Sequence, residues 1–550
     1  MDDHAPSPFA LSRRELLALG GAGLATAAQA RFSPALAQTP KRGGTLSLRL
    51  WDPPHFDPHQ TISYKTHIAY SFTHSRLLKH KAGPAIPAGT FPIEGDLAES
   101  WSQPSETTYV FKLRKGVRWQ NRPPVNGREL TAEDVVYSVE RFRTLKGNAN
   151  AYMLSSLDRV EAIDKHTVKF TLKEPYVWFL DMIANSHAVP IIAKECVEKF
   201  GDLKKPESMV GSGPWMLDSY RPNVGYTFVR NPGYFLSGLP YIDRIEVAVD
   251  EDNASRMAAF IAGKYDLGWE YQGVINRVDW VQIKDTLKQK RPRLQTAEYP
   301  NSVMSHIYMR TDKPPFSDIR VRRAMSLAID RKGIIDSVYE GGAAINPPVP
   351  AALRDWSVPM DQLGEGGRWY KYDLAQAKKL MAEAGFPSGF AATMEFTTYG
   401  SQILIDMTQL VLKGLKDIGI DAKLNTKEYG AYIATTFYGK FDSLAFGPQT
   451  GFQEPDNFLY GQYYPGELKN QSHINDPIVA DMLVRQRRTQ DVAKRREVIY
   501  DIQRYLAKQQ YYVQMPSAIQ IAVWDGALKN YATNVSYDYG GRLLAAWLDR

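Results

Sequence analysis

The sequence predicts an α/β protein with mixed sheets and more than one domain. Stretches in which apolar and polar residues alternate, typical of half-buried strands, are interspersed with stretches of helical period. A chain of 550 residues is too long for one hydrophobic core, so two or three domains are expected. Its hydrophobic content of 44% is typical of a folded protein.

Charge, cysteine content and hydropathy argue against nucleic-acid-binding, disulfide-bonded and membrane-spanning proteins. The formal net charge is +7 without a block of lysine or arginine, so no nucleic-acid partner is expected. Cys196 is the only cysteine, so the chain has no intramolecular disulfide, and its thiol is expected to be a small buried apolar group. No run of ~18 apolar residues follows the N-terminal segment, and no membrane span is expected.

Residues 1–37 are interpreted as an export signal rather than as part of the fold. Residues 12–17 (SRRELL) resemble the twin-arginine motif, and residues 16–28 are apolar but too short to span a bilayer. Cleavage is expected after Ala37, with residues 28–30 (AQA) as the alternative site. The signal predicts a periplasmic protein handled by the twin-arginine export machinery. An ordinary amphipathic helix is the alternative interpretation.

The region after the signal begins with a predicted strand over residues 43–50 and then carries five histidines. They stand at positions 55, 59, 67, 74 and 80, which raises the possibility of a metal site. Prolines at 53, 54 and 58 prevent the first two from sharing a helical face, and no carboxylate completes a set. We therefore expect surface histidines on or before a helix, and no metal.

Residues 96–142 carry the most informative local pattern. Residues 109–113 alternate as a strand, a turn follows at Gly116, and residues 117–119 start another short strand. Thr131 and Asp134 come close to the capping box that opens a helix. That helix is expected to bury one apolar stripe: Val135, Val136 and Val139.

The second half of the chain shows strands followed by capped helices. Residues 305–310 form a predicted strand, and Asp318 is the predicted N-cap of the helix after it. Arginines at 320, 322 and 323 could suggest phosphate binding, but the apolar face of that helix favours solvated or salt-bridged arginines. Further helices are expected over 372–385, 406–419 and, as a pair, 477–507, with strands over 421–428 and 442–446.

Three segments resemble a known family. Residues 96–142, 313–331 (KPPFSDIRVRRAMSLAIDR) and 372–385 (YDLAQAKKLMAEAG) are similar to extracellular solute-binding proteins of family 5, the oligopeptide, dipeptide and nickel class that serves ABC importers. The resemblance implies a two-lobed periplasmic binding protein fold, with a hinge of crossing strands and an inserted α+β subdomain. It implies these boundaries: lobe I over 38–80, 191–303 and 511–550; the insertion over 81–190; and lobe II over 304–510.

A ligand site is expected between the lobes, in a concave space lined by aromatic residues and few polar groups. The resemblance implies that the strand ends carrying the candidates point toward this cleft. The candidate substrate-binding residues are Trp51, Tyr64, Trp269, Glu270, Tyr271, Tyr429, Phe446, Gln449, Thr450, Gly451, Phe452 and Glu454.

Residues 446–460 (FGPQTGFQEPDNFLY) resemble the family segment whose aspartate binds the α-amino group of a peptide. Counting back from Phe458 places that aspartate at Gly451 and the preceding tryptophan at Pro448. A carboxylate facing an ammonium in a dry cleft contributes on the order of a few kcal/mol. Peptides with a free amine are therefore expected to bind poorly, unless another acid substitutes: Glu270, Glu454 or Asp456.

These observations predict a non-enzymatic periplasmic receptor that delivers a small organic solute to an ABC permease. The solute could be peptide-like, an opine, an amine or a sugar derivative, and a monomer without cofactor or metal is expected. A true oligopeptide or dipeptide receptor, a ligand-presenting partner of a chemoreceptor, and nickel or haem carriage stay open. A hydrolase on a two-lobed scaffold is disfavoured because GxSxG, HExxH and Cys–His motifs are absent.

Overall fold

A computed structural model describes residues 39–268, 277–399, 401–449, 452–534 and 536–550. The chain divides into two compact units, Met1–Pro40 and Lys41–Arg550, and the helices and strands named below belong to the second. The predicted export signal, with residues 12–17 and the cleavage after Ala37, lies outside the described residues. Within the described ranges, no helix has the length and apolar composition needed to cross a bilayer.

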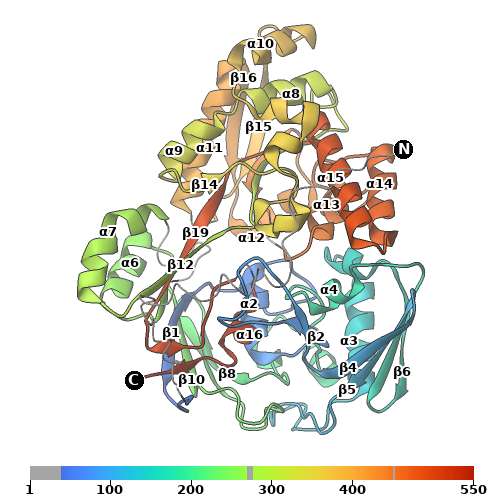
Figure 1. Cartoon of the computed structure of the whole chain (residues 1–550), viewed down its shortest axis with the longest axis vertical. Coiled ribbons are helices and arrows are strands. Elements are labelled where there is room, and N and C mark those ends of the chain that lie inside the picture. The colour runs from blue at the N-terminus through green and yellow to red at the C-terminus, as the bar shows by residue number, and fades with distance from the viewer. Residues whose placement is uncertain (1–38, 269–276, 400, 450–451, 535) are drawn as a thin grey trace, which may run out of the picture. The chain divides into compact units, whose positions relative to one another are not determined.

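The first lobe is built on a four-stranded sheet of order β1-β10-β9-β8 (Figure 1). β1 runs parallel to β10 and the other pairs are antiparallel, so the sheet is mixed. Helix α2 (Tyr64–Thr73) packs on this sheet through Phe72, whose ring stacks on Phe228. The strands are β1 (Thr45–Leu50), β8 (Trp215–Arg221), β9 (Gly225–Arg230) and β10 (Arg244–Val249).

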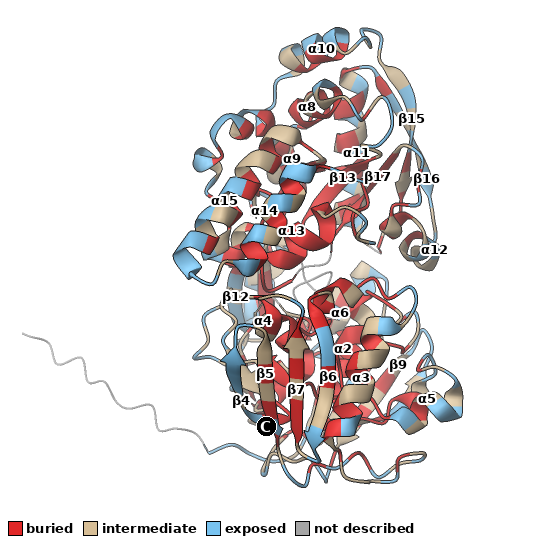
Figure 2. Ribbon diagram, turned by 90° about the vertical axis from the view of Figure 1, so that its right-hand side faces the viewer, coloured by how far each residue is buried: buried red, intermediate tan, exposed pale blue. Residues whose placement is uncertain are grey.

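The inserted subdomain is an antiparallel sheet of order β4-β5-β7-β6, with helix α3 (Ala132–Thr144) packed on β6 and β7. Figure 2 shows the red, buried positions of these strands beside α3. Asp134 accepts the Thr131 backbone N–H at 2.9 Å, which confirms the predicted capping box. The strand expected over residues 117–119 is wrong, because only one bridge forms there. The four strands are β4 (Ala98–Ser105), β5 (Thr108–Leu113), β6 (Leu157–Asp164) and β7 (Thr167–Leu172).

The second lobe is built on a five-stranded mixed sheet of order β16-β15-β17-β13-β18. Its strands are β13 (Ser305–Met309), β15 (Phe390–Phe396), β16 (Ile420–Thr426), β17 (Leu444–Pro448) and β18 (Tyr512–Gln514). Its helices are α8 (Ile319–Leu327), α9 (Arg331–Val338), α10 (Leu374–Glu383), α11 (Gln402–Asp417), α12 (Tyr429–Ala434), α13 (Asp456–Tyr463), α14 (Pro477–Arg488) and α15 (Val492–Gln509).

Two antiparallel strands connect the lobes: β12 (Gln295–Pro300) leads from the first lobe into the second, and β19 (Ser517–Trp524) leads back (Figure 1). The chain crosses between the lobes just beyond them, over residues 301–304 and 515–516. Hydrogen bonds tie the two crossings together: the Ser517 hydroxyl donates to the Val303 carbonyl at 2.8 Å, and the Met515 amide donates to the Ser305 carbonyl at 2.9 Å. This pair is the predicted hinge of crossing strands.

The remaining α-helices and β-strands among the described residues are shorter or lie beside the crossing strands. They are β2 (Leu78–His80), β3 (Ile93–Gly95), α4 (Phe179–Ala184), α5 (Lys194–Phe200), α6 (Asn253–Ile261), β11 (Leu267–Gly268), α7 (Arg277–Lys290), β14 (Ala343–Ala344), β20 (Leu528–Lys529), α16 (Tyr539–Leu543) and β21 (Trp547–Leu548).

The prediction of surface histidines is wrong. His59, His67 and His74 are buried, and only His67 lies within α2. His74 is the C-cap of α2 and His80 lies in β2, so the histidines do not share one helix. Throughout the described part of the chain, no three His, Cys, Asp or Glu side chains are grouped as metal ligands.

The structure also tests the expectations for the cysteine and for the arginines of α8. Cys196 is buried, as predicted. Arg320 pairs with Asp318 at 2.6 Å, as expected of an exposed arginine on this helix. Arg322, in contrast, is buried and donates to the backbone carbonyls of Phe316 and Gln509, so the expectation of a solvated or ion-paired side chain is wrong for it.

Candidate functional site

A small pocket lies where the two lobes meet. The first lobe contributes Ile62, Ser63, Tyr64 and Tyr537, and the second contributes Tyr399, Tyr429, Ile433, Phe437, Pro448 and Gln449. None of these lining residues is charged. The cavity volume is about 20 Å³, and a single water needs roughly 10–15 Å³ of such space, so little more than one water fits. The lobes are therefore closed against each other at this point.

The ends of secondary-structure elements place these side chains. Ser63 is the N-cap of α2, Tyr429 opens α12, and Pro448 ends β17. Ser63 Oγ and Tyr429 Oη lie 3.4 Å apart, joining the two lobes across the pocket. The Gln449 amide donates to the Met304 carbonyl at 2.8 Å, which fixes the end of β17 against one hinge crossing. The two lobes are thus held closed by contacts between the ends of the helices and strands nearest the hinge.

Of the predicted site residues, Tyr64, Tyr429 and Gln449 line this pocket. Trp51 lies behind it, with its ring edge-on to Tyr64 at 5.4 Å. Phe446 packs in the core of the second lobe, and its carbonyl accepts a hydrogen bond from the Tyr432 hydroxyl. Five predicted residues lie outside the described ranges: Trp269, Glu270, Tyr271, Thr450 and Gly451.

Sequence reasoning missed several lining residues. Tyr399 comes shortly after the end of β15, just as Gln449 comes after the end of β17. Ligands of α/β proteins bind at the ends of strands, so this rule could have identified Tyr399 as a site residue. Tyr537 lies 138 residues further along the chain in an irregular segment and had no local signal.

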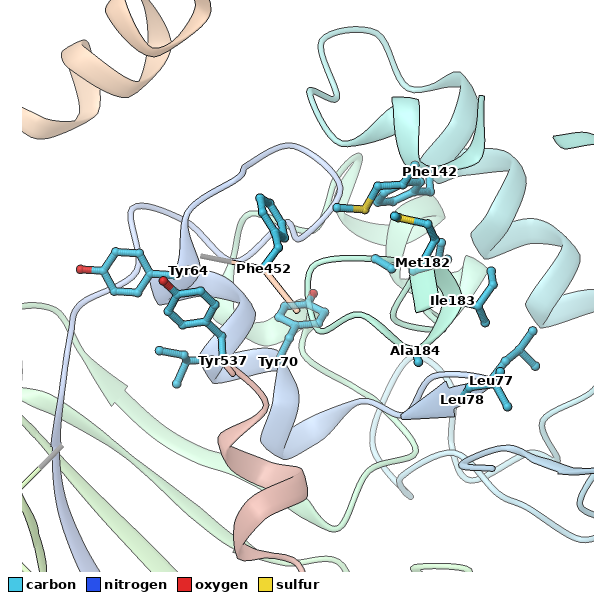
Figure 3. Packing of buried hydrophobic residues seen from close by; sticks show 14 of the residues in the cluster. Tyr64, Tyr70, Leu77, Leu78, Phe142, Met182, Ile183, Ala184, Phe452 and Tyr537 are labelled. Carbon is cyan, nitrogen blue, oxygen red and sulfur yellow. The ribbon is translucent and has the colours of Figure 1, made fainter. Parts of the chain in front are cut away.

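Phe452 projects from the second lobe into the first. Figure 3 shows its ring beside Tyr64, Tyr537 and Tyr70. Its centroid is 5.4 Å from the His187 ring, and His187 is 4.9 Å from the ring of Tyr537. Phe452 therefore belongs to the packed interior of the closed interface, and the His187 ring lies between it and the pocket residue Tyr537.

The carboxyl group of Glu454 already has hydrogen-bond partners within the protein. Its side chain is 2% exposed and accepts hydrogen bonds from the Asn457 backbone amide at 3.0 Å and from the Asn185 side chain at 3.4 Å. Burial, reinforced by the neighbouring carboxylate of Asp181, raises the pKa of Glu454 well above its usual range. This carboxyl group is therefore poorly suited to hold a ligand's ammonium.

Asp456 is occupied as well, and it ties the inserted subdomain to the second lobe. Its carboxylate accepts from Arg487 at 2.7 Å and from the Tyr176 hydroxyl at 2.8 Å. Next to it, the Trp178 indole N–H donates to the Gln486 side-chain oxygen at 2.7 Å. These bonds join the insertion to α13 and α14 and add to the closure at the pocket.

Comparison with known proteins gives consistent matches. Residues 92–470 match the family model of bacterial extracellular solute-binding proteins, family 5, middle region. Heme-binding protein A of Haemophilus influenzae is 28% identical over 399 residues, 68% of this chain and 69% of that protein. Di/tripeptide-binding protein 3 of Pseudomonas aeruginosa is 28% identical over 488 residues, 83% of this chain and 86% of that protein. A structure of the ABC transporter-associated periplasmic binding protein DppA from Helicobacter pylori, in complex with the peptide STSA, has the same fold. Its TM-score is 0.79 at 24% identity, covering 93% of this chain and 99% of that one.

Proposed function

Because this chain belongs to family 5 of the bacterial extracellular solute-binding proteins and is a solute receptor of an ABC importer, we propose that its lobes close on a small organic solute without a free α-ammonium group. The main support is the occupancy of the carboxylates around the site. An ammonium buried in the closed cleft would need a carboxylate that is not already used, since an unpaired buried charge is costly.

Three described carboxylates near the pocket have partners inside the protein. Lys65, whose ammonium lies 4.6 Å from the Tyr429 ring centroid, has three acids in its surroundings. Glu428 accepts the Ala431 amide as the N-cap of α12, and Glu251 pairs with Arg49. Asp52 accepts the hydroxyl of Tyr220 and the amide of Asn223.

The sequence supports the same conclusion at Gly451, where the family pattern has the amine-binding aspartate. Di/tripeptide-binding protein 3 of Pseudomonas aeruginosa is named for peptides, and a peptide receptor is the second candidate function for this chain. Glu270 is the remaining acid of the sequence prediction that could serve an ammonium.

We also propose that the chain is a non-enzymatic, monomeric receptor, exported to the periplasm by the twin-arginine machinery and cleaved after Ala37. Residues 12–17 and the family membership support this. For the lobes, we propose the sequence-based boundaries with one change. The pairing of β18 with β13 supports moving the last boundary from residue 511 to the crossing at 515–516.

The test is thermal unfolding of the mature protein, from Gln38, with free peptides, the same peptides N-acetylated, opines and sugar acids. A ligand at 1,000 times its Kd adds about 4 kcal/mol, which shifts the Tm of a unit of this size by about 4 °C. We expect shifts only from compounds without a free α-amine. A shift with unmodified peptides that acetylation abolishes would establish the peptide receptor instead.

A further inference from the structure

Lys469, in the loop between α13 and α14, is a buried basic side chain that forms no ion pair with a described carboxylate. Its side chain is 4% exposed. The ammonium lies 3.4 Å from the Tyr152 hydroxyl and 4.1 Å from the centroid of the Phe452 ring. Among the described residues, no carboxylate oxygen comes within 4.0 Å of it. Aromatic faces return roughly 2 kcal/mol to a desolvated cation, well below the cost of burying one, so the site lacks a partner for this charge.

His187 gives an independent sign of an unfilled polar site beside the same ring. It is 0% exposed, and neither ring nitrogen has a hydrogen-bond partner within the described part of the chain. Its ring lies 5.4 Å from that of Phe452. A neutral imidazole carries one N–H donor, and leaving it unpaired in the interior costs about 1–3 kcal/mol.

Both groups connect to the pocket through ring contacts. From Phe452 the contacts pass to His187 at 5.4 Å, to Tyr537 at 4.9 Å and to Tyr64 at 5.4 Å. Tyr537 and Tyr64 line the pocket, and Figure 3 shows them next to Phe452. An elongated solute that reached from the pocket to Lys469 would run along this row of rings and displace Phe452 from the lysine.

We propose that Lys469, assisted by His187, is the anion-binding subsite of the solute site, and that the solute carries a carboxylate or a similar oxyanion. The inference rests on the proposed function and names its substrate class. The oxyanion replaces the Phe452 ring as the partner of the ammonium, because a charge-assisted hydrogen bond is stronger than contact with an aromatic face.

The surroundings of Lys469 give this subsite a measurable signature. Burial lowers the pKa of Lys469 to about 7, against the opposing effect of nearby acids. The titratable groups facing it are Glu454 and Glu467 of the second lobe, Tyr152 of the insertion, and His67 and His187 of the first lobe. Burial lowers the pKa of both histidines, so they are uncharged near neutral pH. An oxyanion raises the pKa of the lysine, so binding at pH 7.5 takes up protons. A neutral solute does not have this effect.

The experiment uses the mature protein and paired probes: N-acetyl dipeptides and aldonic acids, each as free acid and as methyl ester or amide. Calorimetry at pH 7.5 in two buffers of different ionisation enthalpy measures affinity and proton uptake together. We expect at least one acid to bind, its ester or amide to bind at least tenfold more weakly, and the acid to take up protons.

Lys469→Met is the variant that tests the residue. It keeps the length of the side chain and removes the charge, so we expect at least a thirtyfold loss of affinity for the acid and no proton uptake. The Tm of the ligand-free protein should stay the same or rise, since an uncompensated charge is removed from the interior. Lys440→Met, on an exposed lysine, is the matched control and should change neither quantity.

The outcomes separate the two proposals. An ester that binds as well as its acid, or a Lys469→Met protein that keeps full affinity for the acid, overturns the anion subsite and leaves the receptor intact. Binding confined to free-amine peptides overturns the proposed function. No binding by any acid of the panel counts against both.

Discussion

The buried carboxylate of Asp456 offers a direct test of what holds the lobes together. It is 0% exposed and is held by Arg487, whose guanidinium also lies 3.2 Å from the Tyr460 ring centroid. The Tyr176 hydroxyl of the insertion donates to the same carboxylate. Asp456→Asn keeps the shape of the side chain and removes its charge, which leaves Arg487 buried without a counter-ion.

The expected loss is about 3–5 kcal/mol, the usual cost of removing one partner of a buried ion pair. With an unfolding entropy of ~2.1 cal/mol/K per residue over the roughly 510 residues of Lys41–Arg550, this lowers the Tm by about 3–5 °C if the unit unfolds in one step. Tyr176→Phe removes only the hydrogen bond from the insertion and should cost about 1.5–3 kcal/mol, or 1–3 °C.

Calorimetric unfolding of the ligand-free protein measures both variants. Asp481→Asn, at an exposed position within α14, is the control and should stay within ~0.5 kcal/mol of the parent protein. The double variant Asp456→Leu with Arg487→Met should recover part of the loss, because an apolar pair needs no counter-ion, although the Tyr176 hydroxyl then has lost its acceptor. If Asp456→Asn unfolds at the same temperature as the control, the pair does not stabilise the closed protein and the reasoning fails.

Three further predictions concern the ligand, the thiol and pH. Gly451→Asp restores the carboxylate of the family pattern and should improve binding of a free-amine dipeptide at least tenfold; titration calorimetry against the N-acetylated dipeptide checks it, and equal affinities for both would contradict it. Burial raises the pKa of Cys196 to about 12, so iodoacetamide should modify this thiol only after denaturation, as mass spectrometry can show. Burial lowers the pKa of five histidines to about 3 or 4 and that of His187 well below its usual value, so the unfolded chain binds these protons first and the free energy of unfolding should fall as pH drops from 6.5 to 4. The five histidines are His59, His67, His74, His80 and His306. The buried acids Asp181, Glu454 and Glu467 have raised pKa values, so they stabilise the folded protein as the pH falls, but they are fewer. A free energy of unfolding that does not change with pH in urea denaturation would be evidence against neutral buried histidines.

Features with a local cause could be predicted from the sequence. The capping box at Thr131 and the N-cap at Asp318 depend on residues within three positions, and both form as expected. Features with a distant cause could not. Glu454 looked available for a ligand because one of its two partners, Asn185, comes from the insertion, 269 residues earlier. The histidines looked exposed for the same reason, since His67 is covered by His187, 120 positions away.

Lys469 shows why the remainder of the site escaped sequence reasoning. It belongs to no motif, and a lone lysine in a loop is usually solvated. Its position becomes informative only when folding places Phe452, Tyr152 and the insertion over it. The chemistry of the site then depends on which charges folding leaves without partners, a property of three-dimensional packing.

The buried charged groups that have no ion-pair partner in the part of the chain that the structure describes favour one kind of solute. Glu454 and Asp456, the described acids that could have met an ammonium, are held by Asn457 and Arg487, whereas the ammonium of Lys469 meets only aromatic rings and one hydroxyl among the described residues. A zwitterionic peptide would bring an ammonium to a site where two of the predicted acids, Glu454 and Asp456, already have partners among the described residues. A solute with an oxyanion and no free amine would satisfy the buried lysine and leave no charge of its own unpaired. Since leaving a buried charge without a partner costs several kcal/mol, this difference is large enough to decide between the two classes of solute.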